Sequence, residues 1–317
     1  MMQIREIEER RLRDASCQEE RWLLGQPPLR KLIDFVDDVG ITEANGNRCA
    51  LIDAWRAAND YYEWLEQQEA RIADAVERVP LDAALEGMAA VLKADPRYGR
   101  TFNSLPTRIE MVELDRLVVC QNHVSQTFVE DLKARLGTHP DPVALFRFCL
   151  PVGEYSAPVQ IRNVDSKRFI FQSESTDFRF HEALVLRAEQ VRDYNTFGEI
   201  AGVLGLVLGF SSNFLNAICD DDSHRLLLHN GYHRACALRE LGITHAPCVI
   251  QTVTRRDELD LIAKPIVARD PGYFFNAPRP PLLKDFWDAR ISTLLPVKRM
   301  RRTIEVSFEI RDYFMQE

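Results

Sequence analysis

Residues 226–242, LLLHNGYHRACALRELG, hold the clearest group of side chains that could do chemistry. A short apolar run ends at Asn230-Gly231, and a helical pattern begins at once with Tyr232, His233 and Arg234. A helix leaves its first N–H groups unpaired and is partly positive at that end, and a preceding glycine lets an anion approach the backbone. Arg234 would fork onto phosphate oxygens, and His233 would add a donor that titrates near neutrality. The spacing therefore predicts a phosphate-binding turn.

Metal binding is the alternative chemistry for this region. His229 and His233 are four residues apart, as in a metal pair, but Gly231 interrupts any continuous helix between them. The run Asp220 to Asp222 is typical of a solvated hairpin tip. The seven cysteines are scattered and include no C-x-x-C pair, so the sequence predicts neither structural zinc nor another metal site.

Composition limits the classes of partner. The 317 residues are 46% hydrophobic and 28% charged, as in ordinary globular proteins, and suffice for about two domains. A net charge of −8 gives no overall attraction to nucleic acid or to an anionic membrane. The odd cysteine count, with no secretion signal, favours a cytoplasmic location. The apolar stretch 200–210 is shorter than the roughly 20 residues of a spanning helix, so we expect a buried strand or core segment and no membrane association.

The chain up to about residue 97 has a helical pattern. Apolar residues recur at alternating spacings of three and four from Arg48 to Val79, which predicts one long helix. The apolar face of this helix either packs within the chain or contacts a protein partner. Its members are Leu51, Trp55, Ala58, Tyr62, Leu65, Ile72, Val76 and Val79. A shorter helix is expected at 81–94, followed by a linker at 95–108. Pro27-Pro28 separates an earlier amphipathic helix from the next one.

From Arg108 the pattern changes to strands mixed with short helices. RIEMVELDRLVV predicts a strand, and QTFVEDLKARLG predicts a helix closed by Gly137. Residues 157–172 and 214–229 predict hairpins, the helix after Gly231 ends at Gly242, and HAPCVIQTV predicts another strand. We expect Phe286 and Trp287 to anchor the proline-rich crossing near residue 280 to the core.

Residues 214–253, with their hairpin, Gly-x-His-Arg turn, helix, Leu-Gly and proline-containing strand, resemble the core of the ParB/sulfiredoxin superfamily. Residues 108–137 resemble its opening strand and helix. The resemblance implies an α+β fold in which a helical N-terminal region (1–97) precedes a ParB/sulfiredoxin-like mixed-sheet domain (108–253). That domain would carry an insertion at about 138–213, and a C-terminal extension (254–317) would follow it.

The resemblance also implies that Asn230, Gly231, Tyr232, His233 and Arg234 bind the phosphates of a nucleotide, ATP/ADP or CTP, with magnesium. Tyr232 stands where sulfiredoxins hold their catalytic cysteine, which disfavours sulfinic acid reduction. Partition proteins carry Gly-Glu-Arg-Arg at this turn and a helix-turn-helix after the domain, and neither is present here. The turn is nearest to that of the free serine kinases, which indicates ATP-dependent phosphotransfer or nucleotide hydrolysis.

The catalytic residues remain unassigned by the sequence. Glu113, Asp115 and Glu182 are candidates for the carboxylate that such a kinase needs. The densest basic cluster of the sequence consists of Lys298, Arg299, Arg301 and Arg302. These side chains either line the solvated edge of a strand or bind nucleic acid or phosphate. Three classes of function remain open: a nucleotide-dependent enzyme, a nucleotide-gated interaction or DNA-associated protein, and a scaffold that binds no nucleotide.

Overall fold

The computed structural model describes residues 17–41, 48–151, 157–175, 177–191, 200–210 and 213–315. The chain divides into two compact units: unit 1 is Met1–Val152 with Asn213–Arg299, and unit 2 is Gly153–Ser212 with Met300–Glu317. Helices occur together with mixed and antiparallel sheets, so the chain is of the α+β class, as expected. Within the described ranges, no helix combines the length and apolar character needed to cross a bilayer.

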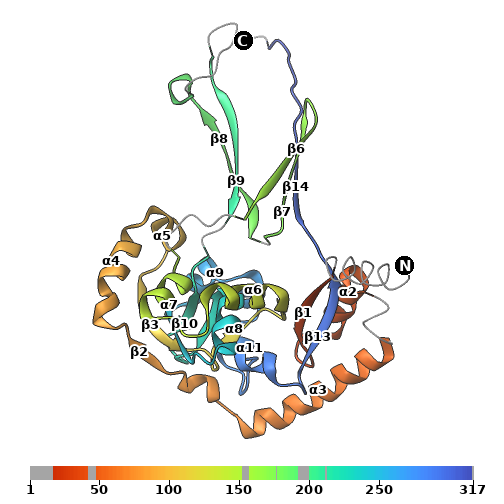
Figure 1. The fold of residues 1–317 in the computed structure, drawn as a ribbon, viewed down its shortest axis with the longest axis vertical. Coiled ribbons are helices and arrows are strands. Elements are labelled where there is room, and N and C mark those ends of the chain that lie inside the picture. The colour runs from red at the N-terminus through yellow and green to blue at the C-terminus, as the bar shows by residue number, and fades with distance from the viewer. Residues whose placement is uncertain are drawn as a thin grey trace, which may run out of the picture. The chain divides into compact units, whose positions relative to one another are not determined.

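A six-stranded mixed sheet in the order β2-β3-β12-β10-β11-β4 lies at the centre of unit 1 (Figure 1). The strands are β2 (Arg78–Pro80), β3 (Thr107–Glu113), β4 (Val118–Val119), β10 (Asn216–Asp220), β11 (Leu226–Asn230) and β12 (His245–Val253). β10 is parallel to β12 and β11 is parallel to β4, while the other neighbours are antiparallel. The predicted β10–β11 hairpin and the strand β12 are confirmed, and their burial explains their nearly continuous apolar sequences.

Short helices complete the core of unit 1. They are α4 (Glu86–Ala94), α5 (Pro96–Thr101), α6 (Gln126–Leu136), α7 (Pro142–Cys149), α8 (Tyr232–Glu240), α9 (Arg256–Ile262), α10 (Pro265–Arg269) and α11 (Pro271–Phe275), with 3-10 turns at Ile72–Ala75, Ala83–Leu85 and Leu283–Trp287. α6 ends at Gly137 as predicted. The expectation of a linker at 95–108 is wrong, because Asp95 caps α5 by accepting from the backbone N–H of Arg97 at 2.8 Å, and Tyr98 is buried. Phe286 is fully buried, as expected.

The N-terminal region is not wholly helical. β1 (Cys17–Leu23) pairs antiparallel with β13 (Ser292–Lys298) on one side and with β5 (His123–Ser125) on the other. These partners lie about 100 and 270 residues further along the chain, so the pairing depends on contacts that the local pattern does not contain. α2 (Leu29–Val39) follows directly after Pro28, as the sequence predicted.

The long helix α3 (Arg48–Gln68) ends eleven residues before the predicted boundary at Val79. Its apolar face is real: Ala58, Tyr62 and Leu65 are buried. The helix stops where Arg71 adopts the left-handed conformation at φ 62°, and the remaining apolar residues continue into a 3-10 turn and β2. The three-four spacing therefore crosses a change of secondary structure.

A buried ion-pair network joins the end of α3 to the proline-rich crossing. The guanidinium of Arg279, only 1% exposed, makes two hydrogen bonds to Asp285, at 2.6 and 2.9 Å, and a third to Glu69 at 2.9 Å. Lys284 binds the other oxygen of Glu69 at 2.6 Å. Tyr62 donates to Asp285 at 3.3 Å. Because every charge has a partner, we interpret the network as structural.

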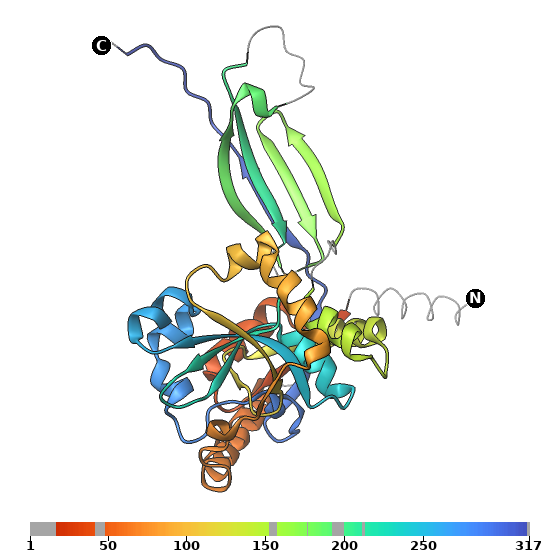
Figure 2. The same ribbon diagram turned by 90° about the vertical axis from the view of Figure 1, so that its left-hand side faces the viewer.

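The described part of unit 2 contains five strands. One antiparallel sheet has the order β14-β7-β6 and consists of β6 (Val159–Asp165), β7 (Arg168–Ser173) and β14 (Arg302–Ser307) (Figures 1 and 2). The other is an antiparallel pair of β8 (Phe178–Leu186) and β9 (Val203–Phe210). A 3-10 turn at Ala188–Gln190 follows β8. The predicted β6–β7 hairpin is confirmed. The stretch 200–210 contains a strand as expected, but Leu204 is 69% exposed, so its predicted burial is wrong. No described layer covers that face of β9.

Candidate functional site

The Gly231 turn has the geometry that the sequence predicted. β11 ends at Asn230, Gly231 lies in the left-handed region at φ 88° and ψ 20°, and α8 begins at Tyr232. The side chain of Asn230 accepts a hydrogen bond from the Gly231 N–H at 2.9 Å. A Cβ on Gly231 would lie 2.7 Å from Leu215 Cδ1 and 2.9 Å from its Cα. Glycine is therefore required by both the backbone angle and the packing.

Tyr232 serves the core rather than a ligand. Its side chain is buried, and its hydroxyl donates to the carbonyl of Leu228 at 2.6 Å while accepting from the N–H of Cys120 at 2.9 Å. These two bonds fasten the segment after β4 to the junction of β11 and α8. Burial raises the pKa of the Tyr232 hydroxyl, so it stays protonated.

His233 is a neutral acceptor. Its Nε2 accepts from the N–H of Ser125, the N-cap of α6, at 3.1 Å, and its ring packs edge-on against Phe128. Burial, with smaller contributions from the charges of His123 and Arg234, lowers the pKa of His233 to about 4. The expectation that the pKa of His233 lies near neutrality is therefore wrong, because desolvation disfavours the imidazolium, whereas a phosphate contact by the N–H on Nδ1 of the neutral ring stays a prediction.

Arg234 lies on the first turn of α8, as predicted. Its guanidinium donates to the backbone carbonyl of Asn213 and lies 5.9 Å from the centre of the Phe148 ring. Two carboxylates of the same segment, Asp220 and Glu240, have other contacts: Glu240 pairs with Lys133 at 2.7 Å, and Asp220 accepts from the N–H of Ser223. The guanidinium thus remains next to the N-terminus of α8.

Lys264 and Asn216, which the sequence did not single out, lie beside the turn. The Lys264 ammonium lies 5.1 Å from the centre of the Tyr232 ring, and within the described ranges it forms no ion pair with a carboxylate. Its charge, after the larger effect of burial, helps to lower the pKa of His229 to about 4. His229 Nδ1 lies 3.1 Å from the side-chain oxygen of the buried Asn216. No local pattern marks Lys264, which stands in an ordinary Lys-Pro helix start.

The candidate carboxylates of unit 1, Glu113 and Asp115, have partners away from the turn. Asp115 pairs with Arg239, at the other end of α8, at 2.6 Å. Glu113 accepts from the N–H of Glu77 and pairs with Arg116 at 3.3 Å. Glu182 lies on β8 in unit 2. Each of the first two carboxylates has a structural contact of its own.

Nucleophilic and metal chemistry have little support in unit 1. Cys236 is fully buried one turn beyond Tyr232, and burial raises its pKa well above the usual range for a thiol. Among the residues with described positions, no three His, Cys, Asp or Glu side chains form a metal-binding group. Among the described side chains at and beside the turn, Asn230 and Asn216 of β10 contribute amide oxygens. These residues do not fit a magnesium ion held by protein carboxylates.

The basic cluster is divided between the two units. Lys298 ends β13 in unit 1. In unit 2, Arg301 lies 3.7 Å from Glu174, and Arg302 donates to the carbonyl of Phe178 at 3.3 Å. A role for this cluster in binding nucleic acid stays a prediction.

Comparison of the chain with known proteins identifies no relative. No family model, curated protein or solved structure matches the chain. The ParB/sulfiredoxin resemblance therefore rests on the residues of the motif alone.

Proposed function

We propose that unit 1 binds a phosphate-bearing ligand of the nucleotide class at the N-terminal end of α8. The observation that carries this proposal is the sign of the local charge. The Lys264 ammonium lies 5.1 Å from the centre of the Tyr232 ring and Arg234 lies on the first turn of α8, and the charges of Lys264 and Arg234 contribute, after burial, to the lowered pKa values of His229 and His233, respectively. A positive region of this kind favours an anion.

The backbone adds to this attraction. Gly231 uses its N–H for the Asn230 side chain, whereas no described group accepts from the N–H groups of Tyr232 and His233. Free N–H groups at the start of a nine-residue helix are suited to phosphate oxygens. In this proposal Lys264 and Arg234 supply the charge, and Asn216, His229 and Asn230 supply neutral polar contacts.

The proposal concerns binding in the first instance. Phosphotransfer or hydrolysis would need a carboxylate or a bound metal beside the phosphates, and Asp115 and Glu113 are held by arginines elsewhere. A nucleotide-gated interaction needs only binding. Measuring nucleotide turnover in the samples used for binding would separate these two activities.

The test compares Lys264→Gln with Lys93→Gln, a matched change at an exposed lysine of α4. Thermal shifts are recorded with ATP, ADP, CTP, GTP, adenosine and inorganic phosphate. Binding at a hundredfold excess over the Kd stabilises the native state by about 2.7 kcal/mol. We expect a shift with at least one nucleotide, none with adenosine, retention in Lys93→Gln and loss in Lys264→Gln. A shift that survives Lys264→Gln, or no shift with any phosphate compound, would refute the proposal.

A further inference from the structure

Two consecutive hydrogen bonds fix the tautomer of His229. The buried side chain of Asn216 donates through Nδ2 to the carbonyl of Phe214 at 3.0 Å. The reverse orientation of this amide would place two acceptor oxygens against each other, so Oδ1 is the atom that faces His229 Nδ1, at 3.1 Å. Because an amide oxygen only accepts, Nδ1 carries the proton of the neutral imidazole. The other ring nitrogen, Nε2, therefore has a free lone pair.

Nε2 of His229 is an open acceptor beside a cation. Within the described ranges no group donates to it, and it is not one of the buried side-chain atoms that lack a partner, so a ligand can reach it. Burial of the ring and the charge of Lys264 lower the pKa of His229 to about 4, so the imidazole is neutral at neutral pH. The same ammonium lies 5.1 Å from the centre of the Tyr232 ring. Lys264 is thus close both to His229 and to the first residue of α8.

A lone pair in this position selects the kind of group that binds it. An ionised phosphate oxygen is itself an acceptor, so it gains no hydrogen bond from Nε2. A metal ion would suit the lone pair, but no three His, Cys, Asp or Glu side chains of the described chain form a metal-binding group, and the charge of Lys264 opposes a cation. A hydroxyl group donates a hydrogen bond and carries no charge. Nε2 is therefore suited to a hydroxyl group that lies close to a phosphate on the same ligand.

We propose that His229 Nε2 accepts a hydrogen bond from a ribose hydroxyl of the bound ligand, so that the site selects ribonucleotides over deoxynucleotides. This inference rests on the phosphate site proposed above. His229 lies two residues before Gly231, and two residues of extended chain span at most about 7 Å. The sugar of a nucleotide follows directly after its phosphates, whereas the amino groups of the bases lie beyond the sugar. A ribose hydroxyl is therefore the neutral donor nearest to the turn.

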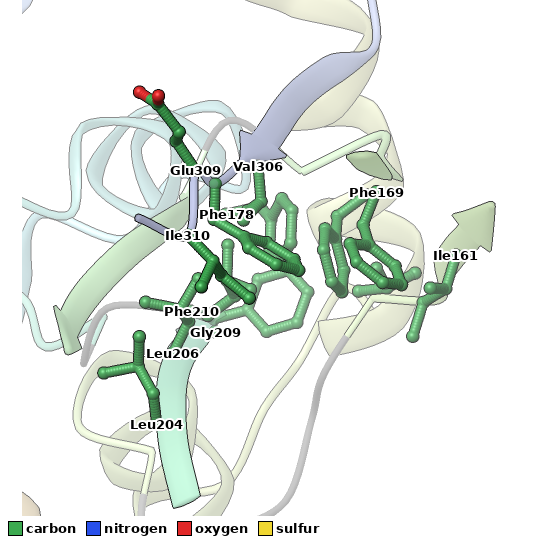
Figure 3. Close-up of a pocket in the computed structure, with 14 residues that line it drawn as sticks. Ile161, Phe169, Phe178, Leu204, Leu206, Gly209, Phe210, Val306, Glu309 and Ile310 are labelled. Carbon is green, nitrogen blue, oxygen red and sulfur yellow. The ribbon is translucent and has the colours of Figure 1, made fainter. Parts of the chain in front are cut away.

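The groove of unit 2 offers no comparable position for a nucleotide. It has a volume of about 850 Å³ and is lined by residues of β6, β7, β8, β9, β14 and the segment that follows β14 (Figure 3). None of the lining side chains donates a hydrogen bond, and the one charged member, Glu309, pairs with Arg311 at 3.0 Å. An apolar lining of this kind disfavours a phosphate group. Selection between sugars is thus expected at His229 and not in the groove.

The experiment measures the Kd of the full chain by titration calorimetry for ATP, CTP and GTP, and for the 2′-deoxy and 3′-deoxy form of each. For every ribonucleotide that binds, one of its two deoxy forms should bind about three- to tenfold more weakly, since it lacks one hydrogen bond. His229→Phe keeps a planar ring and removes the lone pair, so it should abolish this difference. His139→Phe, a matched change at an exposed histidine, should retain it. Circular dichroism serves as the folding control.

Three outcomes would overturn the inference. Equal Kd values of the wild type for a ribonucleotide and both of its deoxy forms would refute the hydroxyl contact and leave the phosphate site standing. A folded His229→Phe variant that weakens all forms by the same factor would show that another group binds the hydroxyl. A wild type that binds none of the nucleotides would refute the phosphate site itself, and the inference with it. Because the first comparison uses the wild type alone, it decides the matter even where His229→Phe does not fold.

Discussion

Replacing Gly231 by alanine tests the turn on which the candidate site is built. The substitution imposes two separate costs. A non-glycine residue at φ 88° is disfavoured by about 1–2 kcal/mol. The new Cβ would also lie 2.7 Å from Leu215 Cδ1 and 2.9 Å from Leu215 Cα, and crowding of this kind in a packed core costs about 1–3 kcal/mol. Because one of the close atoms is backbone, a side-chain rotation cannot relieve the overlap.

The expected loss in the free energy of unfolding is therefore about 2–5 kcal/mol for Gly231→Ala. Gly242→Ala is the matched control, since Gly242 has φ 78° and its Cβ would meet nothing within 4 Å. The control should show only the conformational cost of about 1–2 kcal/mol. The difference between the two variants isolates the contact with Leu215.

Denaturant unfolding followed by tryptophan fluorescence suits this comparison. All four tryptophans, Trp22, Trp55, Trp64 and Trp287, belong to unit 1, so the signal reports that unit alone. Equal losses for Gly231→Ala and Gly242→Ala would refute the packing argument. A neutral Gly231→Ala would refute the turn geometry as well.

Three further predictions concern buried polar groups. Tyr232→Phe should lower the free energy of unfolding by about 1–3 kcal/mol in the same assay, because two buried backbone groups lose their hydroxyl partner. His229 and His233 both have a pKa of about 4 in the folded chain, against 6.5 for the free side chain. Between about pH 6.5 and pH 4 these two imidazoles bind protons only in the unfolded chain, so the free energy of unfolding should fall as the pH is lowered through this range. Each should contribute up to about 1.4 kcal/mol per pH unit in that window, measured by unfolding at successive pH values. Asp285→Ala should cost about 3–5 kcal/mol in chemical unfolding, because it removes the main partner of the buried Arg279.

Each of these predictions has an outcome that would contradict it, and Asp285→Ala has a matched control. Asp257→Ala removes the ion pair between Asp257 and Arg255, whose side chains are 66% and 72% exposed, and should change stability far less than Asp285→Ala. A similar loss for Asp257→Ala and Asp285→Ala would contradict the importance of burial. A Tyr232→Phe variant as stable as wild type would contradict the bridging role of the hydroxyl. Stability that stays flat between pH 6.5 and 4 in wild type, and is unchanged by His233→Gln, would contradict the neutral state of that imidazole.

Local sequence signals were sufficient for the elements next to the candidate site. The apolar run of β11, Asn230-Gly231 and the alanine-containing helix after it act within a few residues of one another, so the strand–turn–helix order was predictable. The same holds for the hairpins and for α6 with its closing Gly137. The long-range elements were not predictable in this way, because β1 becomes a strand only through its pairing with β5 and β13.

The chemistry of the site depended still more on the tertiary structure. The sequence by itself determined that Gly231, His233 and Arg234 meet at the start of a helix. Only the folded chain decided that His233 is a desolvated acceptor, since its environment includes Ser125 and Phe128 from α6 and its N-cap. Lys264 and Tyr232 are 32 positions apart in the sequence, and it is likewise the packing of the folded chain that brings them together. Residue type and spacing determine the local backbone, whereas desolvation and the charges brought near by folding determine the protonation state of a side chain and the ligand it attracts.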